Sequence, residues 1–523
     1  MSLKRCISAL ACFAIVAPVN VYAQASESKI KKDQVEHVLL ISVDGLHALD
    51  LTNWIASNPD SNIGKLSQHG VRYTNASTSL PSDSFPGLAA LVTGGSPQTT
   101  GFWYDVTYNR ELAPPALTTP YGIVGSPNAC SSGVQGTQVG FDEEIDKDLT
   151  RIDAGGGINP GYLPRDPRTC RPVYPHEYLR VNTIFEVAKA GGKHTAWIDK
   201  HPSYEWTNGP SGTGVEDFWG PEINSIPVGL PYVPGCNPLP DQANATPSNA
   251  WTDSIANIRC YDQFKVNGVI NQIEGFTHFR TSQPGTPALF GMNFQAVSVG
   301  EKLKGNGYTD VLGTPSAGLL SELQFVDQQV GRMVYALESR GLANKTLIVL
   351  AAKHGQSAID VQKRVGIKGS PADFLGAAEA FDISDDGSLI WLTSPELTPA
   401  AVTTLSAPST QEALGIQEIF ALNSLREKFD SPTTDARTPD IILKTNTGVI
   451  FTGGSKIAEH GGFNEDDYHV ALLFSLPGLQ QKAVKTPVTN QQVAPSIIKA
   501  LGLDPNALDA VRIEGTNVLP FLF

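Results

Sequence analysis

The sequence has no excess of positive charge, because 52 Asp and Glu residues outnumber 38 Lys and Arg residues and give a formal net charge of −14. A protein that binds the phosphate backbone of a nucleic-acid polymer needs clustered Lys and Arg, so we do not expect that class of partner. Heptad runs and solenoid periods are also missing, which argues against a coiled coil or a repeat array. Hydrophobic residues make up 41% and charged residues 17%, as is typical of a globular protein.

Several catalytic motifs are absent as well. The chain contains no Gly-x-Ser-x-Gly elbow, no His-Glu-x-x-His pair and no Walker-type phosphate loop. These absences argue against a lipase-type serine hydrolase, a zincin metalloprotease and a nucleotide-driven motor. No Cys-x-x-Cys pair occurs either, so we expect neither a thiolate metal site nor a redox site.

Residues 1–23 have the pattern of a secretory signal peptide. Lys4 and Arg5 precede an apolar stretch at 6–19, and small residues lead to Ala23. The apolar stretch is shorter than the roughly 20 residues that a membrane-spanning helix needs, and no later segment is long and apolar enough to span a membrane. We therefore expect a periplasmic or secreted protein, with a flexible leader at 24–35.

Outside the signal peptide the chain has an even number of cysteines, which in an exported protein indicates two disulfides. They are Cys130, Cys170, Cys236 and Cys260. Sequence order favours Cys130–Cys170 and Cys236–Cys260, although four cysteines allow three connectivities and buried free thiols are the alternative.

Continuous apolar runs at 37–43, 347–352 and 470–474 are typical of strands that are buried on both faces of a parallel sheet. Weaker strand candidates lie at 194–198, 290–294 and 389–392, and apolar residues at three- and four-residue steps predict a helix over 319–337. This alternation predicts an α/β fold at 36–523, a three-layer αβα sandwich with a mostly parallel sheet. The region from about 111 to 288 is rich in Pro, Gly, Asn and Ser, and we interpret it as an inserted, loop-rich cap.

Polar residues follow these strands, where open parallel sheets bind their ligands. Asp44 comes directly after the first strand, Lys353 and His354 follow the run at 347–352, and His460 lies between Glu459 and Gly461. Alone, the Asp could start a turn and each His could be structural. Their joint arrangement favours a metal or catalytic site.

Ser84 lies where a helix is expected to begin, with Pro86 in its first turn and Gly94 near its end. A hydroxyl at this place faces free backbone N–H groups and the positive end of the helix dipole. Such a site binds anions and suits a nucleophile that attacks phosphorus or sulfur. The alternative is an ordinary capping serine.

Taken together, the segments VLLISVDG, DSFPG with LVTGG, LAAKHG and AEHGG resemble, in this order, the motifs of the type I phosphodiesterase/nucleotide pyrophosphatase family of the alkaline phosphatase superfamily. The resemblance spans residues 36–515. It implies a Ser or Thr nucleophile and two metal ions, usually zinc. By position it implies Ser84 as the nucleophile and a set of metal ligands comprising Asp44, Ser84, His354 and His460.

The sequence departs from the family pattern at several positions. Lys353 replaces an Asp ligand, Gln295 and Val299 fall at the places of an Asp-x-x-x-His pair, and Gly87 replaces an Asn that often binds a phosphoryl oxygen. We therefore expect one bound divalent ion, zinc by the family pattern, because the second metal site lacks ligands. Gly87 and Gln295 are expected to line the substrate site. Lys353 is expected to act catalytically by supplementing the metal's charge; otherwise it reaches solvent or pairs with Asp44.

The resulting hypothesis is an exported, metal-assisted hydrolase that attacks a small phosphodiester or related phosphate ester through Ser84. Two alternatives stay open. The lost ligands would also fit a degenerate member that binds a ligand without turnover. The same nucleophile would also serve a sulfate or carboxylic ester.

Overall fold

The computed structural model describes residues 29–31, 34–225, 229, 231–243 and 251–523. The predicted signal peptide and part of the predicted leader lie outside the described residues. Within the described chain, no helix combines the length and apolar character that crossing a membrane requires.

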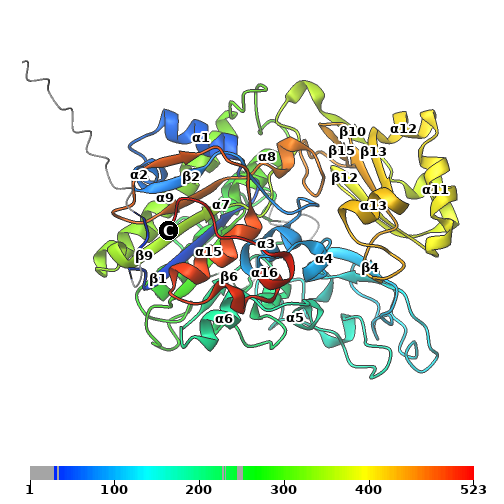
Figure 1. Ribbon diagram of the computed structural model, residues 1–523, viewed down its shortest axis with the longest axis horizontal. Coiled ribbons are helices and arrows are strands. Elements are labelled where there is room, and N and C mark those ends of the chain that lie inside the picture. Colours follow the sequence, from blue (N-terminus) through cyan, green and yellow to red (C-terminus); the bar gives the residue numbers. More distant parts are fainter. Residues whose placement is uncertain (1–28, 32–33, 226–228, 230, 244–250) are drawn as a thin grey trace, which may run out of the picture.

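A central eight-stranded sheet organises the molecule (Figure 1). In sheet order its strands are β17 (Lys482–Val484), β2 (Gly70–Tyr73), β16 (Leu472–Ser475), β9 (Thr346–Ala351), β1 (His37–Val43), β8 (Leu289–Phe294), β6 (Ala196–Ile198) and β7 (Asp217–Trp219). Strand β16 runs antiparallel to β2 and β9, and the other neighbouring pairs are parallel. The predicted mostly parallel sheet is thus confirmed.

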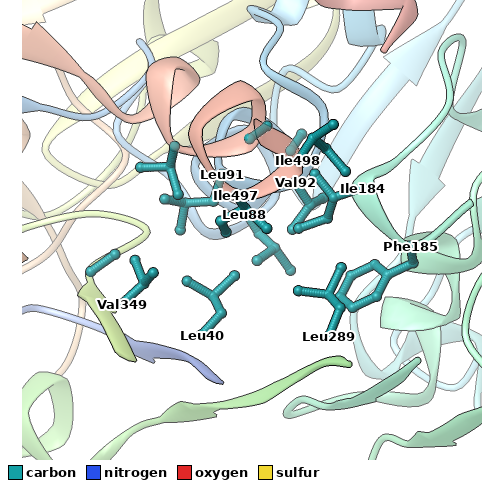
Figure 2. Packing of buried hydrophobic residues seen from close by; sticks show 14 of the residues in the cluster. Leu40, Leu88, Leu91, Val92, Ile184, Phe185, Leu289, Val349, Ile497 and Ile498 are labelled. Carbon is teal, nitrogen blue, oxygen red and sulfur yellow. The ribbon is translucent and has the colours of Figure 1, made fainter. Parts of the chain in front are cut away.

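Helices cover both faces of this sheet because side chains alternate along its strands. On β1, Leu40 packs into one buried apolar cluster and Leu39 into another. Figure 2 shows Leu40 facing Leu88 and Ile497 on the first face. That face is covered by α3 (Ser84–Thr93), α6 (Ile184–Ala190) and α15 (Val493–Ala500). The opposite face is covered by α1 (Ala48–Ser57), α2 (Asn62–Gln68), α7 (Ile255–Ile273), α8 (Ala296–Lys302) and α9 (Ala317–Ser339). The structure therefore has the predicted three-layer αβα sandwich.

A second, antiparallel sheet lies beside the sandwich, in the yellow and orange part of Figure 1. Its order is β11 (Glu379–Ser384), β12 (Gly387–Leu392), β14 (Ile441–Thr445) and β13 (Ile416–Ala421), with α11 (Thr398–Leu405), α12 (Pro408–Leu414) and α13 (Leu422–Lys428) nearby. On β12, Ile390 packs in a cluster with Leu405, whereas Trp391 packs in a cluster with Trp103. Both faces of β12 are buried, which explains why its sequence resembles that of a parallel strand.

The region 111–288, predicted as a cap, also contributes to the sandwich itself. It supplies β6, β7, α6 and α7, so the loop-rich chain is confined to the segments between these elements. Strand β6 lies within the candidate strand at 194–198 and confirms it, whereas β7 has only three residues, which is too short for a clear sequence pattern.

The remaining elements are short. They are β3 (Ala76–Ser77), β4 (Val106–Asn109), β5 (Thr137–Gly140), β10 (Val365–Ile367), β15 (Val449–Phe451), β18 (Val488–Thr489), α4 (Pro97–Thr100), α5 (Pro175–Tyr178), α10 (Ala372–Leu375), α14 (Glu465–Tyr468) and α16 (Asp509–Glu514).

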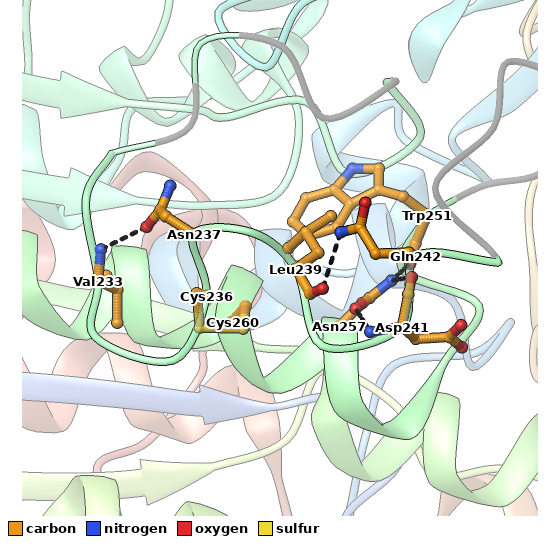
Figure 3. Close-up of a disulfide and its surroundings, with 9 residues drawn as sticks. All are labelled: Val233, Cys236, Asn237, Leu239, Asp241, Gln242, Trp251, Asn257 and Cys260. Atoms are coloured by element: carbon orange, nitrogen blue, oxygen red, sulfur yellow. Dashed lines mark hydrogen bonds between the residues drawn. A yellow bond between two sulfur atoms is a disulfide. The ribbon is translucent and has the colours of Figure 1, made fainter.

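One of the two expected disulfides is present. Cys236 and Cys260 are bonded with their Cα atoms 5.7 Å apart, and the bond ties the loop before α7 to that helix (Figure 3). Cys130 and Cys170 are free thiols, so the second expected pair is not formed. Cys130 Sγ instead donates to the Asp166 carbonyl at 3.9 Å, and burial together with a hydrogen bond to Cys170 raises the pKa of its thiol.

Candidate active site

Ser84 is the first residue of α3, as the sequence predicts, but it is not the capping residue. Asp83 caps the helix, because its side chain accepts a hydrogen bond from the Phe85 N–H at 3.0 Å. The buried Ser84 hydroxyl is thereby released from capping and accepts a hydrogen bond from Lys200 Nζ at 2.9 Å. This contact argues against the ordinary capping serine left open by the sequence.

Lys200 is the residue that the sequence analysis missed. It follows β6, so it stands at a strand end like Asp44 and Lys353, and the candidate strand at 194–198 was the signal that pointed to it. Its Nζ also lies 3.6 Å from Asp44 Oδ2, and 11% of its side chain is exposed. Burial alone would lower the pKa of Lys200, but nearby carboxylates, Asp44 foremost, outweigh burial and raise it. The ammonium is therefore charged at neutral pH.

Asp44 directly follows β1 and is fully buried. Both of its carboxylate oxygens accept amide hydrogen bonds, Oδ1 from Asn293 at 2.7 Å and Oδ2 from Gln295 at 2.6 Å. Burial would raise the pKa of Asp44, but Lys353 and other cations hold it well below its usual range. Gln295 thus lies at the site, bound to Asp44, whereas Val299, in α8, packs against the apolar core.

Lys353 takes neither of the positions that the sequence left open for it. Its side chain is fully buried, and Nζ pairs with Asp199 Oδ1 at 2.8 Å rather than with Asp44 or solvent. The ammonium also lies 4.2 Å from the centre of the Tyr204 ring. The ammonium that contacts Ser84 belongs to Lys200, so Lys353 acts on the site through its charge and through Asp199.

His354 and His460 stack on each other, with ring centroids 3.7 Å apart and an interplanar angle of 9°. His354 Nδ1 lies 2.7 Å from the Gly355 carbonyl, which assigns the ring proton to Nδ1. His354 Nε2 is then a buried lone pair without a hydrogen bond, 3.5 Å from Asp44 Oδ2. Burial lowers the pKa of His354, and burial together with neighbouring cations such as Lys302 lowers that of His460 well below its usual range. Both rings are therefore neutral at neutral pH.

Gly87 brings α3 against the end of β9. A Cβ at this position would lie closer than 3.0 Å to the carbonyl oxygen of Lys353, a distance that real Cβ atoms essentially never show. The glycine is therefore required by the close approach of the helix to the Lys353 backbone, which explains why no larger residue stands there. Its role in substrate binding stays a prediction.

The family model for type I phosphodiesterase/nucleotide pyrophosphatase matches residues 38–122 and 238–469. The chain belongs to this family. Members of the family are phosphoric-ester hydrolases and are typically metal-dependent. A search of curated protein sequences finds no match to the chain.

Solved structures of family members share the fold. Murine ectonucleotide pyrophosphatase/phosphodiesterase 5, an inactive variant in complex with AMP, has a TM-score of 0.56 at 13% identity and covers 90% of this chain and 96% of its own. The human protein of the same name has a TM-score of 0.54 at 12% identity, with coverages of 89% and 95%. The fold is thus retained at very low sequence identity.

The residues at the strand ends do not fit the two metal ions that the family implies. Lys353, Gln295 and Val299 stand where the resemblance to the family places three ligands, and neither oxygen of Asp44 is free of amide donors. The ammonium of Lys200 contacts Ser84 Oγ and approaches Asp44 Oδ2, the two atoms that would have to hold a metal. A divalent ion there would face this charge directly. These donors suit an anion better than a cation.

One other cluster contains ligand-type atoms at metal-binding spacing. Within the described residues, this cluster consists of His47, Asp50 and Glu301, whose possible ligand atoms all lie within 4.8 Å of one another. They are buried and joined by hydrogen bonds, with His47 Nδ1 2.9 Å from Asp50 Oδ2 and Tyr308 donating to Glu301 at 2.7 Å. This group could hold a metal ion, but none of its members is a predicted ligand.

Proposed function

We propose that the protein hydrolyses small phosphodiesters or related phosphate esters with Ser84 as the nucleophile. The observation that carries the proposal is the environment of Ser84 Oγ, which lies at the N-terminus of α3, is not used in capping, and is contacted by the Lys200 ammonium at 2.9 Å. The helix dipole and the ammonium both favour negative charge on the serine oxygen and on the phosphoryl group that it attacks.

The proposed reaction has two steps, which are the formation and the hydrolysis of a covalent phosphoryl-serine intermediate. Ser84 Oγ forms a bond to phosphorus while the bond from phosphorus to the leaving oxygen breaks, and the serine proton ends on that oxygen. Water then attacks phosphorus, the bond to Ser84 Oγ breaks, and one proton of the water restores the hydroxyl. We assign the transfer of these protons to His354, whose pKa burial lowers and whose Nε2 lies 3.5 Å from Asp44 Oδ2.

The same family relationship supports the proposed substrate class and compartment. The murine neighbour was solved with AMP, which supports a nucleotide-type ester as the substrate class. The pattern at 1–23, the Cys236–Cys260 disulfide and the ectonucleotide pyrophosphatase neighbours support an exported, periplasmic or secreted protein. Lys200 and His460 keep 11% and 13% of their side chains exposed, and we propose that a substrate reaches Ser84 from their side.

The expected zinc ion on Asp44, Ser84, His354 and His460 stays a prediction, against which the position of Lys200 argues. Metal analysis of dialysed protein checks this prediction.

The loss of three ligand positions favours a second candidate function, in which the protein binds a phosphate ester without hydrolysing it.

Turnover by Ser84→Ala tests the proposed function. The assay compares bis(4-nitrophenyl) phosphate, a phosphate monoester, a sulfate ester and a carboxylic ester, with the exposed Ser282→Ala as the matched control. We expect the diester to be hydrolysed by the wild type and the control, and the rate to fall by several orders of magnitude in Ser84→Ala. Unchanged turnover in Ser84→Ala would eliminate this nucleophile. A folded wild type that binds phosphate but hydrolyses none of the esters would favour the second candidate.

A further inference from the structure

Lys200 is held in place by its backbone as well as by its side chain. Its N–H donates to Asp199 Oδ1 at 2.9 Å, and its carbonyl accepts from the Ile223 N–H at 3.1 Å and from Tyr261 Oη at 3.2 Å. The side chain is nearly buried and ends on Ser84 Oγ. A lysine anchored in this way at the end of β6 presents its ammonium at a fixed place.

Two lysines pair with two carboxylates near Ser84. Lys353 Nζ pairs with Asp199 at 2.8 Å, and Lys200 Nζ lies 3.6 Å from Asp44. Asp199 joins the two lysines, because the same Oδ1 that binds the Lys353 ammonium also accepts the Lys200 N–H. In a divalent-metal site these carboxylates would balance the charge of the ion. Here ammonium groups from this chain already do so.

The amides next to Asp44 complete the same arrangement. Gln295 and Asn293 each donate an amide N–H to the Asp44 carboxylate. A metal bound to that carboxylate would have to displace these donors or share its oxygens with them. Lys353 and Gln295 thus stand where the family pattern has acidic ligands, and Lys200 and Asn293 lie beside them.

We propose that Lys200 is a further catalytic residue, and that its ammonium supplies the positive charge at Ser84, so that the reaction needs no divalent ion. This inference rests on the proposed function, because Ser84 is the oxygen on which the ammonium acts. Lys353 is a positioning residue that holds Asp199 and, through it, Lys200. An ammonium fixed before the reaction stabilises the developing charge without reorganisation, as a preorganised donor does.

The first test uses the full exported chain with bis(4-nitrophenyl) phosphate, before and after exhaustive chelation. We expect full turnover after chelation and less than about 0.1 tightly bound divalent ion per chain, since a stable zinc site generally needs three to four good ligands. Lys200→Met should lower kcat by about 10²- to 10³-fold, the usual effect of removing one transition-state donor. Lys200→Arg should recover part of the rate, and the exposed Lys345→Met should behave as wild type.

The second test measures metal binding alone, by calorimetric titration with zinc. Lys200→Met combined with Lys353→Asp removes both ammonium groups and adds a carboxylate beside His354, so this double variant should gain zinc binding that the wild type lacks. A wild type that binds stoichiometric zinc, loses turnover on chelation and regains it with zinc would overturn the inference, as would full turnover in Lys200→Met. Either result leaves the role of Ser84 standing, because Ser84→Ala tests that role separately.

Discussion

The buried pair of Lys353 and Asp199 allows a quantitative test of how the strand ends are held together. Lys353→Met keeps most of the side-chain volume but removes an ammonium that lies 2.8 Å from Asp199 and 4.2 Å from the centre of the Tyr204 ring. Asp199 would keep its hydrogen bonds from Trp197 Nε1 and the Lys200 N–H, each at 2.9 Å, but its buried charge would lose its partner. Breaking one side of a buried ion pair typically costs about 3–5 kcal/mol, so we expect the free energy of unfolding to fall by that amount.

Urea denaturation followed by circular dichroism measures this loss, together with Asp199→Asn and the double variant. The double variant should be less destabilised than the sum of the two single changes, with a coupling energy of about 1–3 kcal/mol. Turnover should fall in Lys353→Met because Asp199 also positions Lys200. The control is Lys345→Met, which removes an exposed ion pair with Glu36 and should cost about 0–1 kcal/mol. If Lys353→Met unfolds within about 0.5 kcal/mol of the wild type and keeps its turnover, the buried pair does not hold the site.

Two further predictions concern packing and pH. Gly87→Ala should lower the free energy of unfolding by about 1–3 kcal/mol or more, because the new methyl group collides with the Lys353 carbonyl. Thermal unfolding measures this loss, with Gly453→Ala as the control because a Cβ there meets nothing within 4 Å. Equal stability of the two variants would contradict the prediction. Burial raises the pKa of Glu322 to about 7 in spite of Arg259, so its contribution to stability is present below the unfolded pKa of about 4.5 and is lost as the pH rises through about 7. The free energy of unfolding of Glu322→Gln, relative to that of the wild type, should therefore increase as the pH rises from about 5 to about 8. A difference that does not change with pH would refute the raised pKa of Glu322.

The central strands were the most predictable part of the fold. Strand β1 begins and ends at the predicted residues, since a strand buried on both faces leaves a continuous apolar run. Strand β9 begins one residue earlier than predicted, at Thr346, whose hydroxyl is satisfied by the Leu342 carbonyl. Strand β7 could not be recognised, because three residues are too few to show a period. The second sheet was missed because its strands belong to an antiparallel unit that the apolar run at 389–392 does not distinguish from a parallel one.

The rule that ligands bind beyond the strand ends predicted which residues form the candidate site, but not which side chains they contact. Asp44 and His354 approach to 3.5 Å, and His354 stacks on His460, although these residues are far apart in the sequence. Ser84 joins them through Lys200, which contacts both Ser84 and Asp44. Lys200 escaped the prediction because the rule was applied to the residues after the continuous apolar runs and not to those after the weaker candidate strand at 194–198, which contains β6.

The role of a charged residue depends on the partner that the fold brings to it, and the sequence around Lys353 could not reveal that partner. A lysine after a strand is usually solvated, yet Lys353 is fully buried because Asp199, 154 residues away, supplies a carboxylate. A buried ammonium without that carboxylate would carry a large desolvation cost, and the carboxylate alone would carry a similar one. A lysine can therefore replace the acidic ligand at position 353 only because Asp199 supplies a carboxylate to pair with it. The substitution that looks like the loss of a metal ligand in the sequence is, in the structure, one half of an ion pair that orders Lys200 beside Ser84.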